Sequence, residues 1–285
     1  MLELLVSPRK AERKPWEMFF VGLFYASLSI LLVQWIFSKD AVLADYSGVL
    51  VVTFTVIFSL PFMYFMIRLE EQKTLQHMGS FKLLKEHRKA LWAFLWLFMG
   101  FVVAFSFWYI ILPSAKIVEA QTKTYCAINR PGNFAECVKQ YGVKASSTTV
   151  FATNKERLFL IFANNIYVLI FTLVFSLVFG AGVIFILAWN ASVIAAAIGI
   201  FTQSKLSSLP IGLLRYMVHG LPEIASYFIA ALAGGIISIA VIRHEFGSER
   251  FWDILQDSLD LVIVAVGVLF LSALIEVFVT PLFFS

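Results

Sequence analysis

The stretch LFLIFANNIYVLIFTLVFSLVFGAGVIFILAWNASVIAAAIGIF, residues 158–201, decides the fold of this chain. It contains 44 residues and no charged side chain, whereas roughly 20 residues of helix cover the hydrocarbon core of a bilayer. Gly-Ala-Gly at 180–182 stands near its middle and predicts a turn, because glycine weakens a helix. The stretch therefore predicts two consecutive membrane-spanning helices.

Five other apolar runs are long enough to cross a membrane: residues 16–37, 46–67, 91–112, 221–242 and 261–280. The composition agrees, since 60% of the 285 residues are hydrophobic, 14% are charged and the mean hydropathy is +0.87. A soluble domain carries about 25% charged residues. We therefore expect an all-α, polytopic transmembrane bundle of about seven spans. The first run is too long for a cleaved signal peptide, so we treat it as a retained helix.

The basic residues of the short loops predict the orientation. Lys and Arg gather in the N-terminal segment and in residues 68–90, whereas the loop between the first two spans, residues 38–45, holds only Lys39. Because cytoplasmic loops carry the excess of Lys and Arg, the N-terminus is predicted to be cytoplasmic and the protein to lie in the cell membrane. Residues 113–157 and the C-terminus then lie outside.

This topology divides the chain into three predicted regions. They are an N-terminal three-helix membrane region (1–112), an extracytoplasmic loop (113–157) and a C-terminal membrane region (158–285). The two cysteines, Cys126 and Cys137, both fall in the loop. An oxidising exterior would let them form a disulfide bond, worth about 3 kcal/mol in the chain-entropy model. The alternative is two free thiols, and a metal site is not predicted because the loop contains no His.

Polar side chains at membrane depth are the candidate functional residues, because they are costly there. In the predicted topology five of them share the outer half of the membrane and one lies deeper, so we expect an outward-facing polar cavity lined by the last four spans. The set is Asn164, Asn165, His219, Glu223 and Glu276 in the outer half, with the deeper Asn190 below.

Each of these residues also has a structural interpretation. The asparagines can join helices by hydrogen bonds. Glu223 follows Pro222, which predicts that a helix begins there. Its carboxylate would then lie near a helix N-terminus, where the helix dipole stabilises a negative charge. A continuous helix would instead place His219 and Glu223 on one face. HGLPE, residues 219–223, contains a single His and so lacks the second ligand of a zinc-protease motif.

Small residues and charged stripes predict packing and surface segments. Ala191, Ala195 and Gly199 form one ridge, and Ala230, Gly234 and Ser238 form another, with intrachain packing favoured over self-association. Residues 81–91 are predicted to form a basic surface helix on the inner headgroups. The acidic residues that recur every four positions predict an amphipathic helix with a solvated face or a basic partner: Glu245, Glu249, Asp253 and Asp257.

Four motifs resemble the stage II sporulation protein M family. They are FANNIYVLIFTLVFSLVFGAGVIFILAWNASVIAAAIG (162–199), HGLPEIASYFIAALAGG (219–235), LIEVFVTP (274–281) and, similar to the archaeal branch, SPRKAERKPWEMFFVGLFYAS (7–27). Ala191 departs from the family pattern, in which Gly often follows the Asn. In spore-forming bacteria the namesake acts in engulfment as a membrane anchor for two peptidoglycan-degrading partners, whereas an archaeal-type member would lack that substrate.

The resemblance implies a multipass scaffold or assembly factor with partner proteins. The basic residues predict membrane lipids, and the small-residue faces other copies of the chain, as further partners. The alternatives are a transporter or channel that uses the outward-facing cavity and an intramembrane hydrolase that uses His219 and Glu223. The sequence predicts no enzyme activity and no cofactor. The net charge of +4, with basic residues placed between apolar blocks, favours contact with lipid headgroups over nucleic acid.

Overall fold

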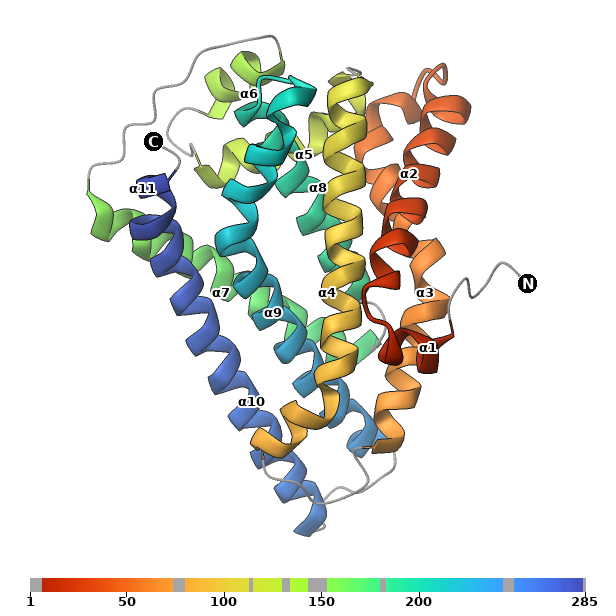
Figure 1. The fold of residues 1–285 in the computed structure, drawn as a ribbon, viewed down its shortest axis with the longest axis vertical. Helices are drawn as coiled ribbons and strands as arrows, with labels where there is room; N and C mark the ends of the chain where they lie inside the picture. Colours follow the sequence, from red (N-terminus) through yellow and green to blue (C-terminus); the bar gives the residue numbers. More distant parts are fainter. Residues whose placement is uncertain are drawn as a thin grey trace.

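The structure is a computed structural model that describes residues 7–73, 80–112, 115–129, 134–142, 153–179, 183–242 and 249–283. Within these ranges the chain forms helices and no strand. Figure 1 shows long helices running along one another, with the short helices α5 and α6 gathered at one end. We call this the cap end, and we call the opposite end, where α9 ends and α10 begins, the base end.

Seven helices of the described chain are long and apolar enough to span a membrane, which confirms the predicted number. They are α2 (Glu17–Phe37), α3 (Ser47–Lys73), α4 (Ser80–Ile111), α7 (Asn154–Phe179), α8 (Val183–Phe201), α9 (Leu209–Ile242) and α10 (Glu249–Leu274). Shorter elements are α1 (Pro8–Arg13), α5 (Ala115–Asn129), α6 (Phe134–Gly142), the π-helical turn Ile275–Val279 and α11 (Thr280–Phe283). The predicted turn at 180–182 lies outside the described residues.

Two segments predicted as surface helices are continuous with spanning helices. Residues 81–91 form the first part of α4, because neither Gly nor Pro interrupts helix propagation before Gly100. Glu249, Asp253 and Asp257 likewise lie on α10, which runs on as the last span, whereas Glu245 lies outside the described residues. The two segments are therefore helical as predicted, and each continues into a span without a break.

The segment between α4 and α7 contains α5 and α6, and we call these two helices the cap. The structure contains the disulfide bond between Cys126 on α5 and Cys137 on α6, with an S–S distance of 2.06 Å. Gln121 on α5 is fully buried, and its Nε2 donates to the backbone oxygen of Gly48 on α3 at 2.9 Å. Helix α5 is therefore attached both to α6 and to the membrane-spanning bundle.

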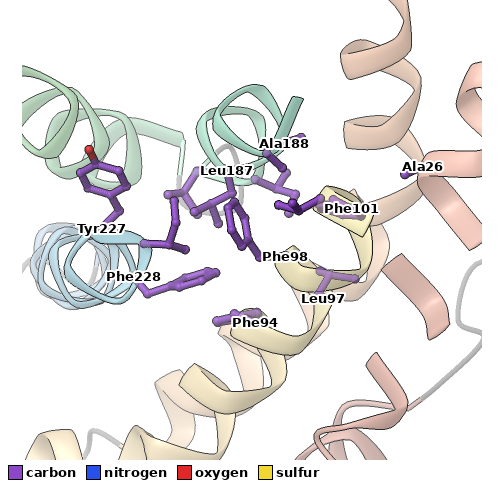
Figure 2. Packing of buried hydrophobic residues seen from close by; sticks show 14 of the residues in the cluster. Ala26, Phe94, Leu97, Phe98, Phe101, Leu187, Ala188, Tyr227 and Phe228 are labelled. Atoms are coloured by element: carbon purple, nitrogen blue, oxygen red, sulfur yellow. The ribbon is translucent and has the colours of Figure 1, made fainter. Parts of the chain in front are cut away.

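Helix α4 lies at the centre of the hydrophobic core. Its buried Phe98 and Phe101 lie beside Leu187 of α8 in Figure 2. On the neighbouring face, Phe94 stacks on Phe228 of α9 with ring centroids 5.2 Å apart. Because α4 packs on helices from both halves of the sequence, it joins the N-terminal spans to the C-terminal ones.

Helices α2 and α4 approach each other through glycine. A Cβ atom added to Gly22 would overlap the backbone oxygen of Leu97, and one added to Gly100 would overlap the backbone oxygen of Phe19. Close backbone approach at small residues is a main source of helix association in membranes. The two glycines therefore set the separation of this helix pair.

Helix α7 is the least buried of the seven spans. Only 17% of its apolar stretch is buried, compared with 61% for α4 and for α8. Its exposed side chains include Phe159, Tyr167 and Phe171. Most of α7 therefore lies on the outer surface of the bundle.

Candidate functional site

Helix α9 passes through Pro222 without ending, so the predicted helix start at this proline was wrong. Proline removes a backbone N–H and disturbs the hydrogen bonds of the preceding turn. The backbone oxygen of His219 in that turn accepts a hydrogen bond from the Ser272 hydroxyl of α10 at 2.7 Å. This bond joins α10 to the turn that precedes the proline, next to Val218, whose carbonyl loses its helical donor at Pro222. His219 and Glu223 consequently lie one turn apart on a continuous helix.

The His219 ring contacts the end of the last span. Its Nδ1 lies 3.3 Å from the Thr280 Oγ1 of α11, and that hydroxyl also donates to the backbone oxygen of Ile275 at 3.2 Å. His219 Nδ1 donates to Thr280 in the tautomer that carries a proton on Nδ1 and accepts from it in the other tautomer. Ile275 begins the π-helical turn, an irregularity that often accompanies functional sites.

Glu223 accepts hydrogen bonds from two helices. The Tyr227 hydroxyl, one turn further along α9, donates to Glu223 Oε1 at 3.0 Å, and the side chain of Asn165 on α7 bonds to the same carboxyl group. Tyr227 is fully buried and Asn165 is 6% exposed. Figure 2 shows that Tyr227 and Phe228 leave α9 in different directions, with Phe228 turned toward Phe94 of α4.

Glu276 lies in the π-helical turn and completes this cluster. It is close enough to both Glu223 and His219 for its charge to act on them, and the charges of Arg157 and Arg215 also reach His219. The structure thus brings four of the six predicted polar residues together at one place, where α7, α9 and the last span meet. We call Asn165, His219, Glu223 and Glu276 the polar cluster.

The other two predicted residues line a cavity between α7 and α8. This groove has a volume of about 310 Å³, and its lining includes Asn164, Tyr167 and Phe171 of α7 with Trp189 and Asn190 of α8. Thr124 of α5 also belongs to the lining, whereas the residues of the polar cluster do not. Asn164 links the two places, because its Nδ2 donates to Asn165 Oδ1 at 3.2 Å.

A sequence model described as Stage II sporulation protein M matches residues 90–281 of the chain. The chain belongs to this family. No curated protein and no solved structure was found to match it. The family region extends from α4 to the start of α11, so it contains the cap, the groove and the whole polar cluster.

The sequence did not predict the contacts of several site residues in this member of the stage II sporulation protein M family. Tyr227 stands four residues after Glu223, and that spacing was a usable signal for a contact on one helix face. Ser272 and Thr280 had no such signal, because they reach His219 only through the packing of separate helices. Tyr125 of α5 forms a side-chain hydrogen bond with Tyr216 of α9, and nothing in the sequence indicated this contact either.

The small-residue ridge of α9 packs within the chain, which confirms the favoured interpretation. A Cβ atom on Gly234 would lie 2.6 Å from the backbone oxygen of Leu173 on α7, and the Ser176 hydroxyl donates to the backbone oxygen of Ala231 at 2.6 Å. On α8, Ala191 is fully buried, whereas no atom lies within 4 Å of a Cβ added to Gly199. The α8 ridge therefore does not provide a close helix contact along its whole length.

Metal ligands are not grouped in the described parts of the chain. Within those ranges no three His, Cys, Asp or Glu side chains are arranged to hold a metal ion. His219 instead directs its Nδ1 to a hydroxyl group, and Glu223 accepts from a hydroxyl and an amide. These contacts give the cluster a network of hydrogen bonds between helices.

Proposed function

We propose that this stage II sporulation protein M family member is a membrane scaffold that positions partner proteins at the cell membrane. The observation that supports the proposal is how its intramembrane polar groups are used. Ser272 joins α10 to α9, Asn165 joins α7 to α9, and Ser176 joins α7 to α9 a second time. Side chains that hold helices together make a rigid anchor, which is the property a scaffold needs.

The cap is the part proposed to contact partners. Besides the disulfide bond and the Gln121 contact, Lys116 of α5 forms an ion pair with Asp45 at 2.7 Å. These links fix α5 and α6 relative to the bundle, while Ala135, Glu136 and Lys139 of α6 remain exposed. A rigid element with an exposed polar face suits protein binding at the membrane surface.

We place the cap outside the cell and the N-terminus in the cytoplasm. The Lys and Arg residues of the segment 68–90 belong to the base end, which would face the cytoplasm by the positive-inside rule. The disulfide bond in the cap fits an oxidising exterior. The similarity of residues 7–27 to the archaeal branch favours an archaeal-type member, whose partners would act on an envelope without murein.

Photo-crosslinking in native membranes tests the scaffold role. A photoreactive amino acid at Glu136, on the exposed face of α6, should capture one defined protein, and the same protein should copurify with the unmodified chain. The matched control is Val42, an exposed residue in the loop between the first two spans, where no such adduct is expected. If Glu136, Ala135 and Lys139 all gave no protein adduct, the scaffold proposal would be rejected.

Transport is a second candidate, favoured by the proximity of two carboxyl groups at membrane depth. Glu223 and Glu276 are close enough to interact electrostatically, and paired ionisable residues in membranes often mark ion or proton pathways. In liposomes, a transporter would show solute or proton flux that Glu276→Gln abolishes. A scaffold would show no such flux and would retain its partner in the Glu276→Gln variant.

A further inference from the structure

The groove between α7 and α8 has side chains whose hydrogen-bonding capacity the protein does not use. Asn190 Nδ2 donates to the backbone oxygen of Ile186 at 2.8 Å, and Asn164 Nδ2 donates to Asn165. Each of the two amides keeps an Oδ1 acceptor for a donor from outside. Tyr167 adds a hydroxyl group, and its side chain is 73% exposed. Polar groups left without partners in hydrocarbon cost several kcal/mol each, so an occupant should supply hydrogen-bond donors.

The depth of the groove restricts the charge of its occupant. Asn164 stands six residues after Leu158, where the uncharged stretch of α7 begins, and Asn190 stands seven residues after the first residue of α8. At 1.5 Å per residue these are about 9 Å and about 10 Å of helix from opposite ends of the apolar stretch. Within the described ranges no Asp, Glu, Lys or Arg lines the groove. A charged headgroup is costly at such depth, so the site suits an uncharged molecule.

The shape of the groove favours a lipid over a partner helix. Its lining among the described residues is dominated by large side chains such as Phe171, Phe185 and Trp189 and contains no Gly, Ala or Ser. Close packing of membrane helices depends on small residues, which are missing here. The volume of about 310 Å³ lies at the small end of ligand pockets, so it holds a headgroup rather than a whole lipid. The groove lies between two spanning helices, one of which is mostly exposed, so the acyl chains can remain in the bilayer.

We propose that the α7–α8 groove binds an uncharged glycerolipid through its free hydroxyl group, with Asn164 and Asn190 as the acceptors. Thr124 of α5 lies at the cap side of the bound headgroup, and Trp189 and Tyr167 form its aromatic walls. The site is separate from the polar cluster and from the exposed face of α6. The inference therefore does not depend on the scaffold role, and either can fail alone.

Photolabelling with diacylglycerol tests this site. The full chain is reconstituted in phosphatidylcholine vesicles that contain diacylglycerol with a photoreactive group on one acyl chain, and the labelled residues are mapped by mass spectrometry. We expect labels to concentrate on α7 and α8 around the groove and to be displaced by unlabelled diacylglycerol. Trp35 of α2, which is 81% exposed, reports the background labelling by bulk lipid.

A methyl ether of the same diacylglycerol separates hydrogen bonding from simple filling of the groove. Blocking the hydroxyl should weaken competition about tenfold, which corresponds to the loss of one hydrogen bond of ordinary strength. The Asn164→Leu and Asn190→Leu substitutions should reduce groove labelling to the level at Trp35. Because the methyl ether is tested on the unaltered chain, the result does not depend on how the variants fold.

Three outcomes would overturn the proposal. Labels spread evenly over α2 and α7 would mean that the groove holds bulk lipid only. Equal competition by diacylglycerol and its methyl ether would mean that the amides do not bind a hydroxyl group. A protein or second-copy adduct that replaces the lipid label at Tyr167 would mean that a helix occupies the groove.

Discussion

At Gly22 and Gly100 helices α2 and α4 touch backbone to backbone, whereas around the polar cluster α9 is held to α7 and α10 by side-chain hydrogen bonds. Lipid is as apolar as the side chains, so burial alone gives membrane helices little reason to associate. The first contact solves this problem by close van der Waals packing and the second by pairing polar groups. The first should therefore be sensitive to the size of one residue, and the second to the chemistry of several.

The largest effect is expected at the glycine contact. Gly22→Ala should destabilise the protein by about 3 kcal/mol, because the new Cβ meets backbone atoms of α4 that cannot move aside without separating the helices. Thermal unfolding in detergent measures the change. Gly267→Ala is the matched control, since a Cβ there has no neighbour within 4 Å and should be neutral or slightly stabilising. Equal effects at both positions would contradict the contact.

Removal of the disulfide bond should affect a third region, the cap, separately from both helix contacts. Cys126→Ser with Cys137→Ser should cost somewhat less than about 3 kcal/mol, because only a short loop is closed. Hydrogen exchange should increase in α5 and α6 and remain unchanged near Gly22 and near Ser272. Treatment of the unaltered chain with a reductant is the control. Faster exchange throughout the bundle would show that the cap is not an independent region.

A smaller effect is expected for single hydrogen bonds in the polar cluster. Tyr227→Phe removes a hydrogen bond within α9 and Ser272→Ala removes one between α10 and α9, and each should cost about 1 kcal/mol. A double-mutant cycle should show coupling between Tyr227→Phe and Glu223→Gln, because the two side chains are bonded. Gly22→Ala with Tyr227→Phe is the distant control pair and should be additive. Coupling in the control pair would mean that the two contacts are not separate.

The smallest effect is expected in the loop between the first two spans. The amides of Leu43 and Val42 donate to Asp40 Oδ1 at 2.8 and 2.9 Å and lower the pKa of that carboxyl group below its ordinary value of 3.8. A lowered folded-state pKa gives stabilisation above the unfolded-state pKa, which is lost as the pH falls through the folded-state value. The difference in unfolding midpoint between the unaltered chain and Asp40→Ala should therefore shrink in acid.

Asp40→Asn provides the control for this pH dependence. Its amide oxygen can still accept from the two backbone N–H groups, but it does not titrate. The midpoint difference between Asp40→Asn and Asp40→Ala should thus stay constant over the same pH range. A difference that changed with pH would assign the effect to another group.

Particular residues show how much the sequence could predict of the fold and the site. The run at 158–201 required two spans because 44 residues exceed one bilayer crossing, and the position of both cysteines in the predicted outer loop favoured a bond that the structure contains. The sequence could not predict that the two adjacent asparagines have different surroundings. Adjacent residues on a helix point about 100° apart, so Asn164 enters the groove while Asn165 turns to Glu223.

The sequence by itself determined that this chain crosses the membrane about seven times, because the length and polarity of each run are set against a bilayer of fixed thickness. Only the tertiary structure decided that α9 continues past Pro222, since a proline inside a membrane helix depends on support from neighbouring helices, and here Ser272, 50 positions later on α10, bonds to the preceding turn. It also decided which polar residues meet. Such contacts depend on helix rotation and tilt, which are set by packing between helices and not by the composition of any one of them.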